Sequence, residues 1–349
     1  MKLALLGLPQ AGKRTLFTLL TGRAIPAGHS ETEAIEGIAP IRDPRVDMLA
    51  RLCKPEKSTY AENIIVLCPD IRQGSDKREW LETARRCDLL CGVVRDSTDE
   101  GVYHPTGSVN AARDRSNLMT EFLFADLMLV DTRLQRMEKE KKSGLAPAQA
   151  SEQKALLKCK EALEKEKGVR DAALEQHELA AVRSLDFLTL KPILWVHNVD
   201  EAMLGPETRR HEKEKDGVFV VSCRIEQEVM SLADAAERIA YMNELGISTL
   251  GPDRLNSAAY DAMGLMSFYT IGSDETRAWT IRKGTLAPAA AGKVHTDIER
   301  GFIRAEIMKY DDLVALGSEK AVKESGKMQL KGKDYMVEDG DICHFRFNV

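Results

Sequence analysis

The sequence predicts an α/β fold with a doubly wound, mostly parallel sheet, an inserted antiparallel helical hairpin and a small β-rich domain at its end. Short apolar runs of the kind that form buried parallel strands recur before residue 100 and again after residue 190. Apolar residues at helical spacing lie between them, and strands that alternate with helices favour this fold class. The apolar runs occupy residues 3–6, 64–67, 89–94, 193–196 and 218–221.

The composition excludes several classes of protein. The chain has 349 residues, enough for two or three domains of about 150 residues each, and 43% hydrophobic with 30% charged side chains is the balance of a folded protein. No run of about 18 apolar residues predicts a membrane span. Seven cysteines without a Cys-x-x-Cys pair indicate free or buried thiols rather than disulfides or a zinc site. We therefore expect a cytoplasmic protein with no membrane contact.

Residues 118–186 predict two long helices that are joined by a turn and form an antiparallel hairpin. Leu127 and Leu134 lie on one helical stripe, and residues 144–147 contain the Gly and Pro that break it. Residues 131–170 hold 11 Lys and Arg against 7 Asp and Glu. The net charge of the whole chain is -5, so a nucleic-acid contact requires a local basic patch of this kind. Solvated hairpin faces and a contact with RNA or protein are both open interpretations.

Residues 265–349 predict a small β-rich domain with one or two helices. Residues 277–281, 301–307 and 342–347 alternate or cluster as strands do, and Gly and Asp residues separate them. A second local basic strip in this domain consists of Lys320, Lys323, Lys327, Lys331 and Lys333. Together with the hairpin, this strip could contact RNA or a ribosomal protein.

Residues 7–13 fit the first seven positions of the phosphate-binding loop, Gly-x-x-x-x-Gly-Lys. They follow a buried strand and precede a helix, so that backbone N–H groups can surround phosphates and the helix N-terminus adds partial positive charge. A lysine at the seventh position reaches the terminal phosphates. A plain strand–turn–helix is the alternative. The predicted phosphate-binding residues are Gly7, Gln10, Ala11, Gly12, Lys13, Arg14 and Thr15.

The eighth position of this loop departs from the pattern. A Ser or Thr hydroxyl is required there because it holds the magnesium ion, whereas this chain has Arg14. Thr15 follows, but one step along a helix rotates a side chain by about 100°, so Thr15 does not simply take over. The guanidinium either lies where the metal would be and neutralises phosphate charge, or extends into solvent. A requirement for Mg²⁺ is therefore in doubt.

The chain resembles the YchF or Obg-like ATPase family of translation-factor-class P-loop proteins over nearly its whole length. The phosphate-binding loop, Gly-Leu-Pro-x-x-Gly-Lys-x-Thr-Leu-Phe, carries this resemblance first. The resemblance implies a P-loop G domain over residues 1–117 and 187–264, the inserted hairpin over 118–186 and a β-grasp domain known as TGS over 265–349. Further matching segments are residues 43–47, 54–56, 185–192, 277–281, 290–297, 301–305, 332–335 and 339–341.

The resemblance also implies a purine nucleotide, with ATP preferred over GTP. A GTP-reading loop has Asn-Lys-x-Asp, whereas here Asn198 and Val199 are followed two positions later by Glu201, like the family's Asn-x-x-Glu. Asn198 is expected to bond the purine N7, and Val199 to pack on the ring. Ser222 and Cys223 match the segment that closes the base pocket. An Asx-type turn without a ligand is the alternative for Asn198.

Two motifs that hold magnesium and sense the γ-phosphate in the family are altered. The second switch motif, Asp-x-x-Gly, has Gln73 in place of its glycine, and Asp70 is a candidate metal ligand. The first switch motif is not recognisable, and Thr32 is the nearest candidate for its metal-binding threonine. Because Arg14 also departs from the pattern, we expect any hydrolysis of the nucleotide to be impaired.

His104 is the candidate catalytic residue. It begins a segment similar to the family's His-x-x-Gly-x-Val-Asn, whose histidine is thought to orient the attacking water. A surface or structural role is the alternative for a single histidine in a loop.

Three hypotheses for function remain open at this point. The first is a nucleotide-binding, ribosome- or RNA-associated regulator with weak or lost hydrolysis. The second is an active, magnesium-dependent ATPase that uses His104. The third is a pseudo-G-protein that serves as an interaction scaffold. If the protein is an enzyme, it is an NTP hydrolase impaired by Arg14 and Gln73.

Overall fold

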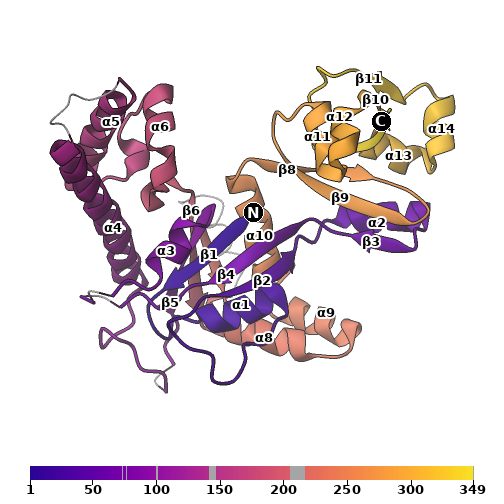
Figure 1. The fold of residues 1–349 in the computed structure, drawn as a ribbon. Coiled ribbons are helices and arrows are strands. Elements are labelled where there is room, and N and C mark those ends of the chain that lie inside the picture. Colours follow the sequence, from indigo (N-terminus) through magenta and orange to yellow (C-terminus); the bar gives the residue numbers. More distant parts are fainter. Residues whose placement is uncertain (73, 76, 100, 141–146, 205–216, 349) are drawn as a thin grey trace. The chain divides into compact units, whose positions relative to one another are not determined.

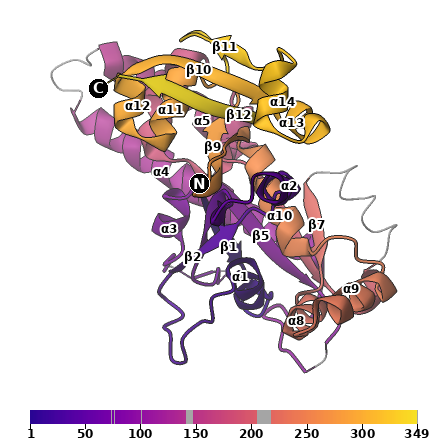
Figure 2. The same cartoon turned by 90° about the vertical axis from the view of Figure 1, so that its right-hand side faces the viewer.

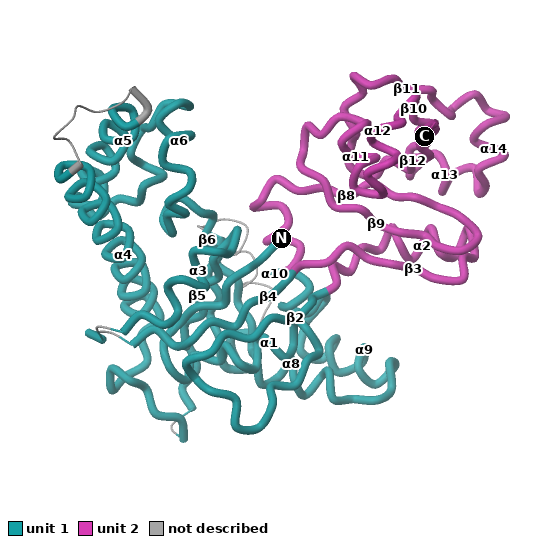
Figure 3. The backbone as a smooth tube through the Cα atoms, viewed as in Figure 1, with its two compact units in different colours: residues 1–39, 64–255 teal, residues 40–63, 256–349 magenta. Residues whose placement is uncertain are grey.

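The computed structural model describes residues 1–72, 74–75, 77–99, 101–140, 147–204 and 217–348. The chain forms two compact units (Figure 3). The first unit contains residues 1–39 and 64–255, and the second contains residues 40–63 and 256–349. Our sequence-based division assigns residues 40–63 to the nucleotide-binding domain, whereas the structure groups them with the C-terminal residues. The finer boundaries between three domains stay a prediction.

A six-stranded sheet with the strand order β2-β4-β1-β5-β6-β7 forms the centre of the first unit. The pairings of β1 with β4 and β5, of β5 with β6 and of β6 with β7 are all parallel. The predicted doubly wound, mostly parallel sheet is therefore confirmed. The strands are β1 (Lys2–Gly7), β2 (Ile35–Pro40), β4 (Glu62–Leu67), β5 (Leu89–Asp96), β6 (Ile193–Val199) and β7 (Val218–Val221).

Helices cover this sheet because both of its faces are apolar. Leu6 on β1 and Leu90 on β5 are fully buried, and they belong to a cluster with Trp80 and Phe122, whose rings lie 5.8 Å apart. Figure 1 shows α1 and α8 beside each other at the lower part of the unit. The helices that accompany the sheet are α1 (Lys13–Thr21), α3 (Leu81–Arg85), α8 (Cys223–Ser231), α9 (Ala235–Glu244) and α10 (Gly251–Ala262).

The predicted hairpin consists of α4 (Ala111–Glu140) and α5 (Pro147–Glu164). Arg133 pairs with Glu152 at 2.7 Å and Asp131 pairs with Lys160 at 2.7 Å, so the two helices run antiparallel. The first helix begins seven residues before the predicted start at residue 118, and most of the predicted break lies outside the described residues. Short helices follow: η2 (Val169–Asp171), α6 (Gln176–Val182), η3 (Arg183–Leu185), η4 (Leu188–Leu190) and η5 (Glu201–Met203).

The second unit contains a six-stranded mixed sheet with the order β11-β10-β12-β8-β9-β3. Ala287, Ala290 and Ala291 of α11 belong to one buried cluster with Phe302 and Phe345 of this sheet. Figures 1 and 2 show α11 beside the sheet. The predicted β-rich domain is confirmed, but residues 265–348 contain four helices, where the sequence predicted one or two. Its strands are β3 (Lys57–Thr59), β8 (Leu265–Thr270), β9 (Glu275–Arg282), β10 (Phe302–Lys309), β11 (Gln329–Lys331) and β12 (Asp341–Phe347), and its helices are α2 (Pro44–Cys53), α11 (Ala287–Val294), α12 (Thr296–Arg300), α13 (Tyr310–Leu316) and α14 (Glu319–Glu324).

A polar network holds residues 40–63 within the second unit. Asp43 caps the N-terminus of α2 by accepting from the backbone N–H of Arg45, and it also accepts from the hydroxyl of Tyr269. Arg45 pairs with Asp339 at 2.6 Å and lies 5.3 Å from the centre of the Tyr269 ring. Burial raises the pKa of Asp43, but the hydrogen bonds from Arg45 and Tyr269 outweigh it and lower that pKa below its ordinary value.

Two further expectations concern cysteines and membranes. All seven cysteines are unpaired, and all but Cys53 are buried, so the expected free or buried thiols are confirmed. Within the described parts of the chain, no helix is both long enough and apolar enough to cross a membrane.

Candidate functional site

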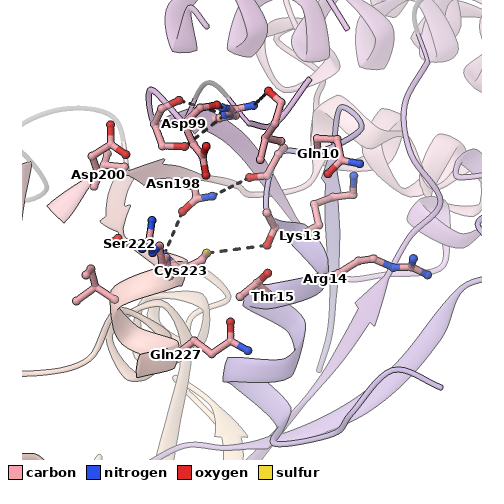
Figure 4. Close-up of a pocket in the computed structure, with 18 of the residues that line it drawn as sticks. Gln10, Lys13, Arg14, Thr15, Asp99, Asn198, Asp200, Ser222, Cys223 and Gln227 are labelled. Atoms are coloured by element: carbon pink, nitrogen blue, oxygen red, sulfur yellow. Dashed lines mark hydrogen bonds between the residues drawn. The ribbon is translucent and has the colours of Figure 1, made fainter. Parts of the chain in front are cut away.

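A cavity of about 980 Å³ lies in the first unit, at the carboxyl ends of β1, β5 and β6 (Figure 4). Loops that follow parallel strands meet at this edge of a sheet, which is where open α/β sheets bind ligands. Among the described residues, Gly7, Thr32 and His104 are the predicted site residues that do not line it. The predicted site residues that do are Gln10, Ala11, Gly12, Lys13, Arg14, Thr15, Asp70, Asn198, Val199, Glu201, Ser222 and Cys223.

The phosphate-binding loop connects β1 directly to α1, and its glycines are required by the geometry. Gly12 has φ +97°, and a Cβ atom there would lie 2.3 Å from Nδ2 of Asn198. A Cβ atom on Gly7 would lie 2.4 Å from the carbonyl oxygen of Val93. Gln10 also has a positive φ of 62°. Side chains at either glycine would therefore displace the loop or its neighbours.

Lys13 has all three of its ammonium protons engaged by the protein. Its Nζ donates to the carbonyl oxygens of Gly7 at 2.9 Å and Leu8 at 3.0 Å, and to the carboxylate of Asp70. The side chain is only 4% exposed, and burial lowers its pKa although the Asp70 charge opposes that change. Asp70, predicted as a metal ligand, thus lies against Lys13. A bound phosphate would replace one or more of these acceptors.

Asn198 connects three loops of the site. Its Nδ2 donates to the carbonyl oxygen of Ala11 at 3.3 Å, and its Oδ1 accepts from the backbone N–H of Cys223 at 3.0 Å. The Cys223 thiol points to the carbonyl oxygen of Gly12 at 3.9 Å, and burial raises its pKa. Asn198 therefore connects the phosphate-binding loop to the segment at Ser222 and Cys223. Its predicted contact with a purine N7 stays a prediction.

Two residues that the sequence reasoning missed fix another wall of the cavity. Arg95 is 3% exposed and donates to the backbone carbonyl oxygens of Ser97 at 3.1 Å, Val102 at 2.8 Å and Asp99. Asp200 accepts from the backbone N–H and the hydroxyl of Thr98, both at 2.7 Å, and these bonds lower its pKa. The available signal was position, because Arg95 is the second-last residue of the buried strand β5, which pairs with β1 just before the phosphate-binding loop.

Comparisons with known proteins agree with this geometry. A curated relative in Haemophilus ducreyi, named a ribosome-binding ATPase YchF, is 38% identical over 100% of this chain and 99% of its own length. The relatives of the same name in Escherichia coli O157:H7 and Bacillus subtilis are 37% and 36% identical, with coverage of at least 98% of each chain. The chain belongs to the YchF family.

A solved structure and a family model extend this assignment. The structure of the Schizosaccharomyces pombe YchF GTPase matches with a TM-score of 0.83 and 29% identity, over 99% of this chain and 97% of that one. Residues 265–348 match the model YchF-GTPase_C, which is described as "Protein of unknown function (DUF933)". The YchF resemblance inferred from the motifs is confirmed.

His104, the residue suggested by the YchF resemblance as catalytic, is 8% exposed and lies outside the cavity lining. Its Nδ1 accepts from the backbone N–H of Thr106 at 3.3 Å, so the ring proton is on Nε2. That nitrogen lies 3.0 Å from Oδ2 of Asp114, a buried oxygen that no other described residue satisfies. His104 therefore has its partners outside the cavity lining, and its catalytic role stays a prediction.

Two switch candidates remain, Thr32 and Gln73, and the structure describes only Thr32. Thr32 is exposed and its hydroxyl bonds that of Ser30 at 2.8 Å. Its neighbours Ser30, Glu31 and Glu33 do line the cavity. Gln73 lies outside the described residues. Within the described part of the chain, no group of three or more His, Cys, Asp or Glu residues could hold a metal ion.

Proposed function

We propose that this chain binds a purine nucleotide, prefers ATP to GTP, hydrolyses it slowly and acts as a nucleotide-dependent regulator on the ribosome. The observation that carries the proposal is Lys13, which is buried at the base of a phosphate-binding loop that lines a cavity of about 980 Å³. Full-length relatives named ribosome-binding ATPases support the choice of nucleotide and partner.

The preference for ATP rests on the fourth position of the base-reading loop. An Asp there accepts hydrogen bonds from two guanine protons in GTP-binding proteins, whereas adenine lacks the N1 proton and offers an exocyclic amine. This chain places Glu201 at that position and buries Val199 beside it. The extra methylene of Glu201 moves the carboxylate away from the geometry that guanine requires.

Slow hydrolysis follows from the groups around the phosphate end. Arg14 replaces a hydroxyl, Asp70 pairs with Lys13, and His104 is held outside the cavity. Loss of one preorganised contact costs about 3 kcal/mol in the barrier. Two or more independent losses reduce turnover by roughly 10⁴-fold.

Calorimetric titration with ATP and GTP tests nucleotide binding. We expect ATP to bind at least about tenfold more tightly than GTP. Lys13→Gln should abolish both signals, and Lys165→Gln, which removes an exposed lysine outside the cavity, should leave them unchanged. If neither nucleotide binds the wild type, the proposal is wrong and the interaction scaffold remains.

Co-sedimentation with ribosomes tests the second part of the proposal. We expect the protein to pellet with ribosomes in a manner that depends on bound ATP and weakens as salt rises. Absence from the pellet in the ATP-bound, ADP-bound and nucleotide-free states would refute ribosome association. That result would leave nucleotide binding standing.

A further inference from the structure

Arg14 is a charged side chain at the phosphate-binding loop that contacts no partner among the described residues. It is the second residue of α1, is exposed, and lines both the main cavity and an adjoining hollow of about 460 Å³. No described residue forms a hydrogen bond or ion pair with its guanidinium. Figure 4 shows the side chain extending from the start of α1 away from Asn198 and Cys223.

The residues at this end of the cavity do not fit a magnesium ion. Mg²⁺ requires oxygen ligands in near-octahedral geometry, and P-loop proteins supply one from the hydroxyl at the eighth position of the loop. Here that position carries the cation Arg14, which repels a divalent ion. The carboxylate of Asp70 is occupied by Lys13, and Thr32 does not line the cavity.

Arg14 can supply the positive charge that the rest of the loop lacks for binding phosphates. The ion pair with Asp70 cancels the charge of Lys13, so Arg14 provides the net positive charge of these three side chains. A guanidinium donates two parallel N–H bonds to phosphate oxygens, which a hydroxyl cannot do. The N-terminus of α1 adds its own partial charge beside it. Because Arg14 has no described partner to leave, it can turn towards a bound phosphate without breaking a contact.

We infer that Arg14 takes the place of the magnesium ion: its guanidinium binds the β- and γ-phosphate oxygens, and the protein binds ATP independently of magnesium. The inference rests on the proposed nucleotide binding and deepens it. It also explains how a tight nucleotide complex and slow hydrolysis can coexist, because Arg14 neutralises phosphate charge without activating water.

Titration of ATP into the wild type, in magnesium and in EDTA, tests the inference. We expect the two dissociation constants to differ by less than about threefold. Arg14→Thr restores the hydroxyl of an ordinary phosphate-binding loop, and we expect it to bind ATP at least about tenfold more weakly in EDTA and to recover in magnesium. Arg14→Lys keeps the charge but not the fork of donors, so its affinity in EDTA should be intermediate.

A matched control is Arg51→Thr, which removes the same charge from an exposed residue of α2 and should bind ATP like the wild type. Thermal unfolding establishes that each variant is folded. Wild-type binding that is at least about tenfold weaker in EDTA overturns the inference and leaves the proposed function intact. Equal binding by the wild type and Arg14→Thr in EDTA also overturns it. If ATP does not bind under either condition, both proposals fail.

Discussion

At the scale of single residues, the site depends on backbone positions that no other amino acid can occupy. Gly12 combines a left-handed conformation with a close approach to the Asn198 amide, at 2.3 Å from where a Cβ atom would lie. Gly28 has a positive φ of 82°, but a Cβ atom there would meet nothing within 4 Å. Substitutions at these two glycines therefore distinguish the effect of backbone strain from the effect of a steric conflict.

Gly12→Ala is expected to weaken ATP binding at least about tenfold and to destabilise the fold by about 1–3 kcal/mol, because it strains the loop and displaces Asn198. Gly28→Ala bears only the conformational cost, about 1 kcal/mol, and should bind ATP normally. ATP titration and chemical denaturation measure both effects. If the two variants behave alike, the contact with Asn198 has no role in shaping the loop.

His104 offers a second test at this scale. His104→Ala leaves Oδ2 of the buried Asp114 carboxylate without a described partner, while Oδ1 keeps its contact with Arg113, so we expect a loss of stability of about 1–3 kcal/mol. Turnover of ATP should change little, because the histidine is outside the cavity. Tyr103→Ala, at a neighbouring residue that is 74% exposed, is the control for stability. A large fall in magnesium-dependent phosphate release would instead favour the active ATPase that uses His104.

At the scale of secondary-structure elements, local patterns predict what forms but not what it pairs with. The five predicted apolar runs are all strands of the first sheet. Strands that are buried on both faces are apolar at successive positions, which makes them recognisable in the sequence. The three-residue strand β3 carries no such pattern, and its partner β9 lies more than 200 residues later. Our division therefore kept residues 40–63 with the first sheet, whereas the structure groups them with residues 256–349.

In the candidate site, too, the sequence predicts motifs of fixed spacing but not the partners of individual side chains. Fixed spacing identified the phosphate-binding loop, because its glycines and lysine must occur in that order. Arg95 and Asp200 were missed because their partners are mainly backbone groups, which leave no trace in side-chain patterns. The sequence likewise gives no sign that Asp114 holds His104 away from the cavity.

Asp43 gives a pH prediction for the contacts of α2. Its pKa is lowered from 3.8, so the stabilisation is fully present above that value and is lost as pH falls through the lower folded pKa. Asp43→Asn should cost about 1–3 kcal/mol at pH 7, and the difference from the wild type should shrink towards pH 2–3. Urea unfolding across this pH range measures it. An unchanged difference at low pH would show that the Asp43 charge does not contribute.

At the scale of the whole molecule, the distribution of charge bears on the proposed association with the ribosome. Arg133, Lys158 and Lys160 of the hairpin all pair with carboxylates of the same region. These ion pairs neutralise part of the excess positive charge of the hairpin. In the second unit, Lys320 and Lys327 of the strip pair with Glu324 and Asp312 in the same way. Lys323 and Lys333 are exposed and have no described ion-pair partner, so they are candidates for contacts with phosphates.

Replacing Lys323 and Lys333 with Glu should weaken ribosome association and reduce its salt slope by roughly one to two. The matched control replaces Lys283 and Lys293, exposed lysines of the same unit outside the strip. Co-sedimentation at several salt concentrations provides the measurement. Equal salt slopes for the two double variants would exclude the strip as the contact.

The discontinuous second unit also constrains the order in which the protein can fold during synthesis. Residues 40–63 emerge early, but β3 pairs with β9, and the rest of that unit begins only at residue 256. At about 5–20 residues per second, the segment waits roughly 10–40 s for its partners. During that time α2 and β3 lack the core against which they pack. Val46 and Leu49, which the folded protein buries, would then be the part of this segment that a chaperone of nascent chains could shield.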